Sequence, residues 1–343
     1  MQQKVFGAAP QGERLARLSR SPHFENGIFK NISPTGMMRK DASYFKLLTD
    51  FLNTPETNTP PKTLPSVKVD LSAIASEKPV VVWFGHSSYL IKAGGFTVLV
   101  DPVFSRYASP VSFYGKAYDG ADAYSADDMP DLDMVIITHD HYDHLDYETV
   151  LKLNAKTKHF YTALGVGAHL EAWDIDSSKI TELDWWETIA VSDAVQLTAT
   201  PARHFSGRKL TQFETLWASF VLKLPECQIY IGGDSGYDTH FKEIGEKFGA
   251  FDIAFLECGQ YGEDWPFIHS FPEETAQAAR DLNAKILMPV HWAKFSLAFH
   301  TWNEPIERLL KQAKALKVEV ATPRIGEPFS LDETYPKTIW WRF

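Results

Sequence analysis

An apolar run leads directly into a cluster of histidines and aspartates in the stretch Met134-Val135-Ile136-Ile137-Thr138-His139-Asp140-His141-Tyr142-Asp143-His144. The apolar residues predict a buried strand over 134–138, so the polar residues are expected on the loop at its carboxyl end. Four possible donors so close together (His139, His141, Asp143 and His144) would be costly to bury without a cation. Imidazole and carboxylate groups suit Zn²⁺, and also Fe or Mn. The stretch therefore predicts a metal site.

Further donors are expected at the ends of other predicted strands. His204 follows a strand at 197–201, Asp234 follows one at 229–233, and His291 follows one at 286–290. Two glycines before Asp234 let the backbone approach a neighbour closely. Three strands that each deliver a donor at the same end would complete a metal site. The predicted metal ligands are His139, His141, Asp143, His144, His204, Asp234 and His291.

The order of predicted elements indicates an α/β protein in which two mixed sheets are stacked, with helices outside. Apolar runs at 80–84, 89–92 and 96–100 predict strands, with Gly94-Gly95 as a hairpin turn. After residue 134, strands alternate with segments of helical spacing. One of these helices is expected to begin with a capping box formed by Ser270 and Glu273.

Three segments are expected along the chain. Residues 1–75 contain several prolines among threonine and asparagine, which predicts an irregular extension and linker with a short helix near 44–52. Residues 76–331 are expected to form the main domain, because no break in composition interrupts residues 79–330. Residues 332–343 are expected to be a tail that packs on this domain or extends it.

The composition is that of a globular chain. Of 343 residues, 44% are hydrophobic and 23% are charged, which excludes a disordered or fibrous protein. No apolar stretch approaches the ~20 residues that span a bilayer, and no signal peptide is expected. Two cysteines, Cys227 and Cys258, favour a reducing cytoplasm. The net charge of −10 argues against a nucleic-acid partner.

Several motifs together resemble those of a known family. The order HxHxDH, a later histidine, a Gly-Gly-Asp segment and a final histidine is similar to the metallo-β-lactamase superfamily. Other segments resemble the branch of phospholipases D that hydrolyse N-acylphosphatidylethanolamine. These are Trp83-Phe84-Gly85-His86-Ser87-Ser88, Asp101-Pro102-Val103-Phe104-Ser105, Ala108-Ser109-Pro110, Gly232-Gly233-Asp234-Ser235-Gly236-Tyr237, His291-Trp292 and Thr322-Pro323-Arg324-Ile325-Gly326-Glu327. The resemblance runs from about residue 79 to residue 331.

The resemblance implies an αββα four-layer sandwich, with two mixed β-sheets flanked by helices and a binuclear site at one edge of the sheets. One metal would be held by His139, His141 and His204. The other would be held by Asp143, His144 and His291, with Asp234 bridging both. Relatives with a redox di-iron centre resemble this pattern with a glutamate at position 141. The histidine therefore favours a hydrolytic site with two Zn²⁺ per chain, with Fe or Mn as alternatives.

The expected mechanism is attack by a hydroxide that bridges the two ions, because such a pair lowers the pKa of bound water to around 7. We expect Asp143 and His269 to take part in catalysis. The resemblance places His269 near the substrate, where a histidine can help the leaving group by donating a proton or hydrogen bond. Asp101 is a candidate to orient a ligand histidine, and His86 is expected to be structural or to support a ligand.

The leading hypothesis is a metal-dependent phosphodiesterase with a small-molecule or lipid substrate, of which an N-acylphosphatidylethanolamine-type phospholipid is the example that the resemblance implies. The alternatives are a lactonase acting on a phosphorylated sugar lactone and a non-catalytic binding module stabilised by metal. A nuclease is disfavoured by the acidic charge. Trp340, Trp341 and Phe343 are expected to form an exposed apolar end, which together with the lipid resemblance predicts peripheral membrane contact. The sequence predicts no oligomeric state.

Overall fold

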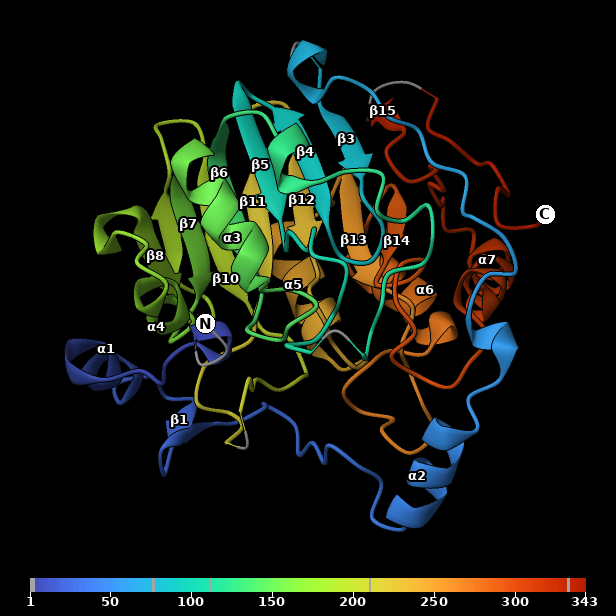
Figure 1. The fold of residues 1–343 in the computed structure, drawn as a ribbon. Helices are drawn as coiled ribbons and strands as arrows, with labels where there is room; N and C mark the ends of the chain where they lie inside the picture. The colour runs from blue at the N-terminus through green and yellow to red at the C-terminus, as the bar shows by residue number, and fades with distance from the viewer. Residues whose placement is uncertain (1–3, 76–77, 112, 210, 332–333) are drawn as a thin grey trace.

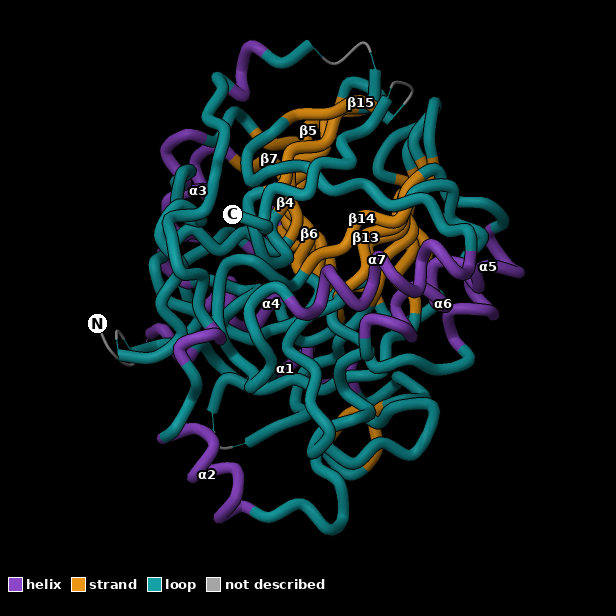
Figure 2. Tube along the Cα trace, turned by 90° about the vertical axis from the view of Figure 1, so that its right-hand side faces the viewer, coloured by secondary structure: helices purple, strands orange, loops and turns teal. Residues whose placement is uncertain are grey.

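Two mixed β-sheets pack face to face in the computed structural model, which describes all residues except 1–3, 76–77, 112, 210 and 332–333 (Figure 1). Figure 2 shows the sheets side by side, with helix α3 (Tyr147–Leu153) outside one sheet. Helices α5 (His240–Phe248) and α6 (Pro272–Asp281) lie outside the other. The αββα sandwich expected from the sequence is therefore confirmed.

The first sheet has seven strands in the order β15-β3-β4-β5-β6-β7-β8. Its first four strands pair antiparallel, whereas β5 to β8 pair parallel. The parallel part is built by crossovers through α3 and α4 (Gly167–Ala172). The strands are β3 Val80–Trp83, β4 Tyr89–Ala93, β5 Phe96–Val100, β6 Leu132–Ile137, β7 Thr157–Ala163, β8 Ile180–Leu183 and β15 Pro328–Ser330.

The second sheet has six strands in the order β14-β13-β12-β11-β10-β9. Strands β9 to β12 pair antiparallel, and β12 to β14 pair parallel. Helix α7 (Glu304–Leu316) follows the last of these strands and packs on α6. The strands are β9 Thr188–Ala190, β10 Gln196–Thr200, β11 Ser219–Lys223, β12 Gln228–Ile231, β13 Ile253–Glu257 and β14 Leu287–Val290.

The core between the sheets is made of apolar side chains from both. Each sheet turns a hydrophobic face inward, as a two-sheet sandwich requires. One direct contact across the interface is the stack of Tyr89 from β4 on Phe255 from β13, with ring centroids 3.9 Å apart and planes 8° from parallel. Both side chains are buried. The two sheets therefore form one body with a common core.

The segment before residue 76 is held against the sandwich at several points. It contains α1 (Gly12–Leu18), the hairpin of β1 (Phe24–Glu25) and β2 (Ile28–Phe29), and α2 (Tyr44–Leu52), which coincides with the predicted short helix. Leu18 and Phe29 are fully buried in the main core. Arg14 donates to the buried carboxylate of Glu182 over 2.8 Å. The predicted boundaries at 75/76 and 331/332 involve residues that lie outside the described ones.

The carboxyl-terminal tail gives a correction. Trp340 and Trp341 were expected to be exposed, but their exposed fractions are 7% and 1%. Trp340 stacks on Trp292, and Trp341 donates from Nε1 to Glu307 on α7 over 2.8 Å. Phe343 is 44% exposed. The tail returns onto the domain, so the tryptophan pair forms no exposed apolar end.

Other sequence-based boundaries differ by small amounts. Helix α6 is not capped by Ser270 and Glu273; instead, the Glu274 carboxylate accepts from the backbone N–H of Phe271 over 2.9 Å. The Ser270 hydroxyl donates to the Ser235 carbonyl. The short strands β8, β9 and β15 were not predicted. Short helical turns of the 3-10 type complete the fold at Lys4–Phe6, Glu56–Asn58, Leu71–Ala73, Ala126–Asp128, Asn154–Lys156 and Ser177–Lys179.

Candidate metal centre

The predicted donors meet because the strands that carry them point in the same direction. In the first sheet, β3, β5 and β6 run one way, and in the second sheet β10, β12, β13 and β14 do so. The loop of residues 139–145, which we call the His-rich loop, follows β6. His204, Asp234 and His291 come after β10, β12 and β14. All seven predicted ligands therefore lie on loops at strand carboxyl ends.

The first group consists of His139, His141, His204 and Asp234, whose donor atoms lie within 4.8 Å of one another. Nδ1 of His141 is 3.0 Å from Nε2 of His139 and 3.2 Å from Nε2 of His204. Two nitrogens bonded to one tetrahedral zinc at about 2.05 Å would be about 3.3 Å apart. The three imidazoles are therefore arranged as they would be around a single ion.

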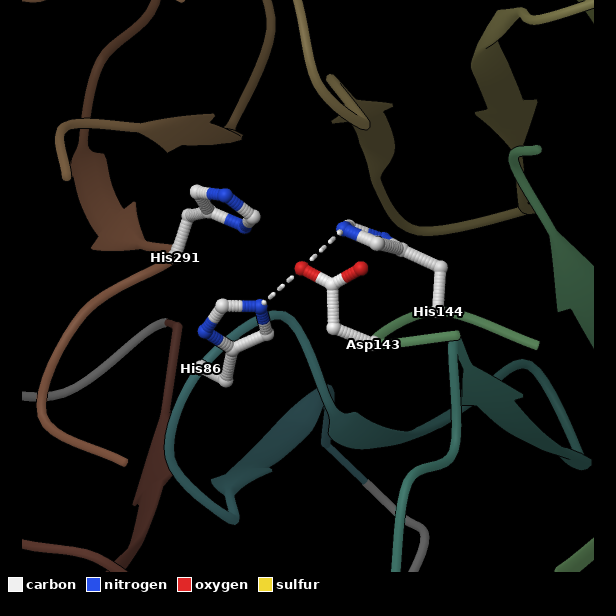
Figure 3. A group of neighbouring side chains, drawn as sticks. All are labelled: His86, Asp143, His144 and His291. Atoms are coloured by element: carbon white, nitrogen blue, oxygen red, sulfur yellow. Dashed lines mark hydrogen bonds and ion pairs between the residues drawn. The ribbon is translucent and has the colours of Figure 1, made fainter. Parts of the chain in front are cut away.

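The second group consists of His86, Asp143, His144 and His291 (Figure 3). The carboxylate of Asp143 lies between two rings, with Oδ2 2.9 Å from Nε2 of His86 and 3.6 Å from Nε2 of His144. Asp234 reaches this group too, since Oδ2 is 3.2 Å from Nε2 of His144 and Oδ1 is 3.1 Å from Nδ1 of His291. Asp234 thus lies at the junction of the two groups. His86 belongs to the second group, although it is not among the seven predicted ligands.

The donor chemistry of both groups fits divalent ions. Nε2 of His144 and Oδ1 of Asp234 are buried and make no hydrogen bond of normal geometry, although they lie 3.2 Å from Oδ2 of Asp234 and 3.1 Å from Nδ1 of His291. Polar atoms sealed from water are normally hydrogen-bonded, so these two atoms need another partner. Imidazole nitrogens and carboxylate oxygens are the ligand types that Zn²⁺ takes.

Neighbouring side chains hold the ligand rings in one orientation. Asp101 accepts from Nδ1 of His144 over 2.8 Å and also from the hydroxyl and the backbone N–H of Thr138. Nδ1 of His204 lies 2.7 Å from the carbonyl oxygen of Ile268, which makes Nδ1 the donor and leaves Nε2 free to ligate. Such outer contacts fix the tautomer of a metal-binding histidine. The expected orienting role of Asp101 matches this geometry.

Burial lowers the pKa of three ligand imidazoles, whereas neighbouring carboxylates raise that of His144. Burial lowers the pKa of His139, His204 and His291 well below the usual range, and repulsion from neighbouring imidazoles adds to the effect. Burial raises the pKa of Asp234 to about 7, although His144 opposes this shift. For His144 itself, the nearby carboxylates outweigh burial and raise its pKa. The neutral form of histidine is the one that binds metal.

Close approach of the backbone at the site explains why residues 232 and 233 are glycines. A Cβ on Gly233, where φ is +61°, would lie 2.9 Å from the Cβ of Thr138, directly before the His-rich loop. A Cβ on Gly232 would lie 2.5 Å from the carbonyl oxygen of Phe255. Both approaches exclude larger residues, and they bring the Asp234 loop against β6 and β13. His86 and His291 also have positive φ, at 51° and 66°, a costly conformation that often marks functional positions.

His269 lies beside the two groups. Its ring stacks on that of His291 with centroids 5.2 Å apart, and it meets His204 edge-on at 5.0 Å. Nδ1 of His269 lies 2.6 Å from Oε2 of Glu257, the last residue of β13. Burial lowers the pKa of His269 and raises that of Glu257. The structure therefore brings this predicted catalytic residue next to the candidate ligands.

Sequence reasoning missed three residues that support the site. Glu257 ends the apolar strand β13 and contacts His269, and a carboxylate at the end of an apolar strand is a signal in the sequence that could have identified it. Asn31, from the N-terminal segment, hydrogen-bonds both backbone groups of His204. Arg208 is buried and donates to the carbonyls of Asp140 and Leu145 in the His-rich loop. Nothing in the sequence indicated these last two contacts.

An open cavity of about 440 Å³ lies at the amino-terminal end of α3. It is bounded by the first turn of α3, including Asp146 and Tyr147, and by the loop that contains Ser105, Arg106 and Val111. Asp146 is nearly buried and accepts from the backbone N–H of Ser105.

The comparison with protein families agrees with this arrangement. Residues 97–292, more than half of the chain, match the model of the β-lactamase superfamily domain. The chain belongs to the metallo-β-lactamase superfamily. It is a metal-dependent hydrolase of that superfamily, with His/Asp clusters able to bind metal.

Relatives within the superfamily include proteins with and without a described activity. An uncharacterized protein of Mycobacterium tuberculosis is 38% identical over 94% of this chain and 88% of its own length. An N-acyl-phosphatidylethanolamine-hydrolyzing phospholipase D of Caenorhabditis elegans is 31% identical over 68% of this chain and 70% of its own length. The predicted resemblance to this branch is therefore confirmed.

Solved structures of the superfamily share the fold. A metallo hydrolase from the archaeon Ignicoccus hospitalis superposes with a TM-score of 0.56 and 18% identity, covering 75% of this chain and all of that one. At this identity the similarity concerns the metallo-β-lactamase fold alone. None of the helices in the described part of the chain is long and apolar enough to cross a membrane.

Proposed function

We propose that this chain is a binuclear phosphodiesterase that cleaves a phospholipid of the N-acylphosphatidylethanolamine type on the alcohol side of the phosphate. The observation that carries the proposal is the position of Asp234 between two groups of donors, within 3.8 Å of His139, His144 and His291. A carboxylate shared in this way is suited to bridging two ions, and two-metal sites are typical of phosphoryl-transfer hydrolases.

The residues proposed to hold the ions are those predicted from the sequence. His139, His141 and His204 would hold one zinc ion, and Asp143, His144 and His291 the other, with Asp234 between them. When bound, such ions lower the pKa of water and stabilise negative charge on a phosphoryl group. Fe and Mn remain alternatives to zinc because the donor types also suit them.

The chain's own residues contribute orientation and proton transfer. Asp143 is held by Nε2 of His86 over 2.9 Å, which fixes the carboxylate toward the site. His269 is the proposed proton donor to the leaving oxygen, since its ring lies over His291 and against His204. An alcohol leaves as a neutral molecule only when its oxygen gains a proton, so a donor at this place accelerates departure.

The phospholipid is proposed from two kinds of support. The relatives include enzymes named for hydrolysis of N-acyl-phosphatidylethanolamine at about 30% identity. Five large apolar side chains are exposed, three on α2 and two farther along the chain: Phe45, Phe51, Leu52, Val111 and Phe113. Phe51 contacts Tyr114, whose pKa is raised by burial and by the nearby charge of Asp143. The apolar end of α2 is thereby linked to the site through Tyr114.

Peripheral contact with a lipid surface is part of the proposal, and it rests on exposed apolar side chains other than the C-terminal tryptophans. The tryptophans first considered are buried, whereas Phe45, Phe51, Leu52, Val111 and Phe113 are exposed. A lipid substrate has to leave its bilayer to reach buried ligands, and exposed aromatic residues would lower the cost of that step. A location in the cytoplasm remains a prediction from the two cysteines, which are free and buried.

The test is hydrolysis of a substrate panel by the zinc-loaded protein, with metal content measured by elemental analysis. Release of phosphatidic acid from the phospholipid supports the proposal. Opening of a phosphorylated sugar lactone with no phosphodiester turnover would overturn it in favour of the lactonase. Asp234→Asn and His141→Ala should lose activity by more than the ~10–100-fold typical of residues that only support a ligand. His159→Ala, a change on β7 away from the donor groups, is the control and should retain activity.

A further inference from the structure

Glu257 is a buried carboxylate at the end of a strand whose other residues are apolar. It closes β13, between β12 and β14, whose following loops carry Asp234 and His291. The side chain is 3% exposed. Burying a charge is costly unless it is hydrogen-bonded, so an apolar residue would be the simpler choice for this place in the sheet. The carboxylate therefore calls for a functional explanation.

Three donors converge on Glu257. Oε1 accepts from the backbone N–H of Ser235 over 2.7 Å and from that of Ser270 over 3.3 Å. Oε2 lies 2.6 Å from Nδ1 of His269. Ser235 directly follows Asp234 of the candidate metal site, and Ser270 directly follows His269. One carboxylate thus ties the loop after β12 to the loop before α6.

The other ring nitrogen of His269 is left free by this contact. Among the described residues, none hydrogen-bonds Nε2, and Nε2 is not among the buried polar atoms without a partner. The side chain is 13% exposed and lies over the rings of His291 and His204. Because Nδ1 is occupied by Glu257, Nε2 on the opposite side of the ring is the nitrogen available to a substrate.

We propose that Glu257 is the positioning residue for His269: its side chain binds Nδ1 and fixes the ring, so that Nε2 is presented to the leaving oxygen as the proton donor. This inference rests on the proposed phosphodiester hydrolysis. A carboxylate bonded to Nδ1 orients an imidazole and stabilises the imidazolium, as in other acid–base pairs. It acts through His269 and does not touch the substrate.

The proton balance of the step is complete without another reactant. The oxygen of a water molecule forms a bond to phosphorus, and the bond from phosphorus to the alcohol oxygen breaks. The alcohol oxygen takes the proton from Nε2 of His269, giving the neutral alcohol and a phosphate monoester. The proton released by the attacking water goes to solvent, and solvent returns one to Nε2. Nδ1 stays bonded to Glu257 throughout.

The first experiment compares two substrates that differ only in the leaving group. Both are phosphatidyl esters, one of ethanolamine type and one of p-nitrophenol, whose phenolate leaves without a proton. For Glu257→Gln, kcat on the alkyl ester should fall by ~10²–10⁴, whereas kcat on the p-nitrophenyl ester and both KM values should stay within a few-fold. The double variant with His269→Gln should lose no more than His269→Gln alone.

Controls separate positioning from folding. Glu274→Gln changes a carboxylate that caps α6 nearby and should affect both substrates alike. If Glu257→Gln is unfolded by circular dichroism, Glu257→Asp keeps the charge but withdraws it from the ring, and the same preference for the p-nitrophenyl ester is expected. Equal losses on both substrates by a folded variant would overturn the proposal and leave the phosphodiesterase assignment intact.

A second measurement does not depend on activity. In metal-free protein, long-range ¹H–¹⁵N spectra of the imidazoles report which nitrogen carries the proton, and His269→Gln identifies the signal. We expect Nδ1 of His269 to be protonated in the native protein and the pattern to change in Glu257→Met, which has a similar size but no oxygen to accept from Nδ1. An unchanged pattern would overturn the proposal. If no phosphodiester is hydrolysed by the native protein, the proposed function fails while this spectrum still decides the role of Glu257.

Discussion

Replacing Asn31 tests whether the N-terminal segment supports the metal site. Asn31 donates from Nδ2 to the carbonyl of His204 over 2.7 Å and accepts from the N–H of His204 over 3.0 Å. It also accepts from Nε1 of Trp217, which keeps a second acceptor at the carbonyl of Ala202. In Asn31→Ala, the backbone groups of His204 lose their partner, whereas the indole does not.

The magnitude follows from these two backbone groups. A buried polar group left without a partner costs about 1–3 kcal/mol. Because Asn31 is half-buried and water can replace part of the loss, we expect the free energy of unfolding to fall by about 2–4 kcal/mol. The ring of His204 is still held through Ile268, so zinc affinity should fall by about 10-fold, at the lower end of the range for such supports.

The assay combines urea unfolding of metal-free protein with zinc competition against a chelator. Asn31→Asp keeps the acceptor but turns an oxygen toward the His204 carbonyl, so it should be no more stable than Asn31→Ala. Asn53→Ala, at the exposed end of α2, is the control and should change stability by less than about 0.5 kcal/mol. Asn31 variants with native stability and zinc affinity would refute the idea that this segment positions a ligand.

Three further changes test other parts of the structure. Arg208→Lys should lower the free energy of unfolding by about 2–4 kcal/mol, because a lysine cannot reach all three carbonyls that the guanidinium binds; urea unfolding at native stability would contradict this. Burial lowers the pKa of Lys294 to about 8 from 10.5, so the folded state holds fewer protons between these values and stability rises with pH there. Relative to Lys294→Met, the free energy of unfolding of the native protein should rise by about 3 kcal/mol from pH 8 to 10.5. Parallel curves of unfolding free energy against pH for the two proteins would disprove the pKa shift. Gly236→Ala places a Cβ 1.9 Å from the Phe267 carbonyl and should destabilise the protein more than Gly207→Ala, whose Cβ comes no closer than 3.1 Å, to the flexible side chain of Gln212; equal thermal unfolding temperatures for the two variants would exclude the clash.

The sequence was informative where a strand contains a continuous apolar run that ends in a polar residue. Residues 134–137 of β6, followed by the His-rich loop, illustrate this, because burial of successive residues produces a run whose end is easily located. Strands β8 and β15 are short and mix polar with apolar residues, so they have no comparable periodicity. Their strand character comes from pairing with β7 and β3, which is a tertiary effect.

Contacts between segments far apart in the chain were not predictable in the same way. The C-terminal tryptophans looked like an exposed end because their partner Trp292 is some fifty positions earlier. Asn31 and His204 are 173 positions apart, and no sequence motif contains both residues. A single sequence carries local preferences, whereas these contacts depend on how the finished sandwich brings the N-terminal segment and the tail against the domain.

The candidate metal site joins the two sheets rather than belonging to either one. The His-rich loop comes from the first sheet, whereas His204, Asp234 and His291 come from the second. Within each sheet, backbone ladders hold the strands whether or not a cation is present. Between the sheets, the buried carboxylate of Asp234 faces His144 across 3.2 Å, and it is costly to bury without positive charge. Ions bound there would stabilise the packing of one sheet on the other, because only the folded sandwich brings these ligands together. Metal affinity and the stability of the interface between the sheets are therefore linked, and outer contacts such as that of Asn31 strengthen both.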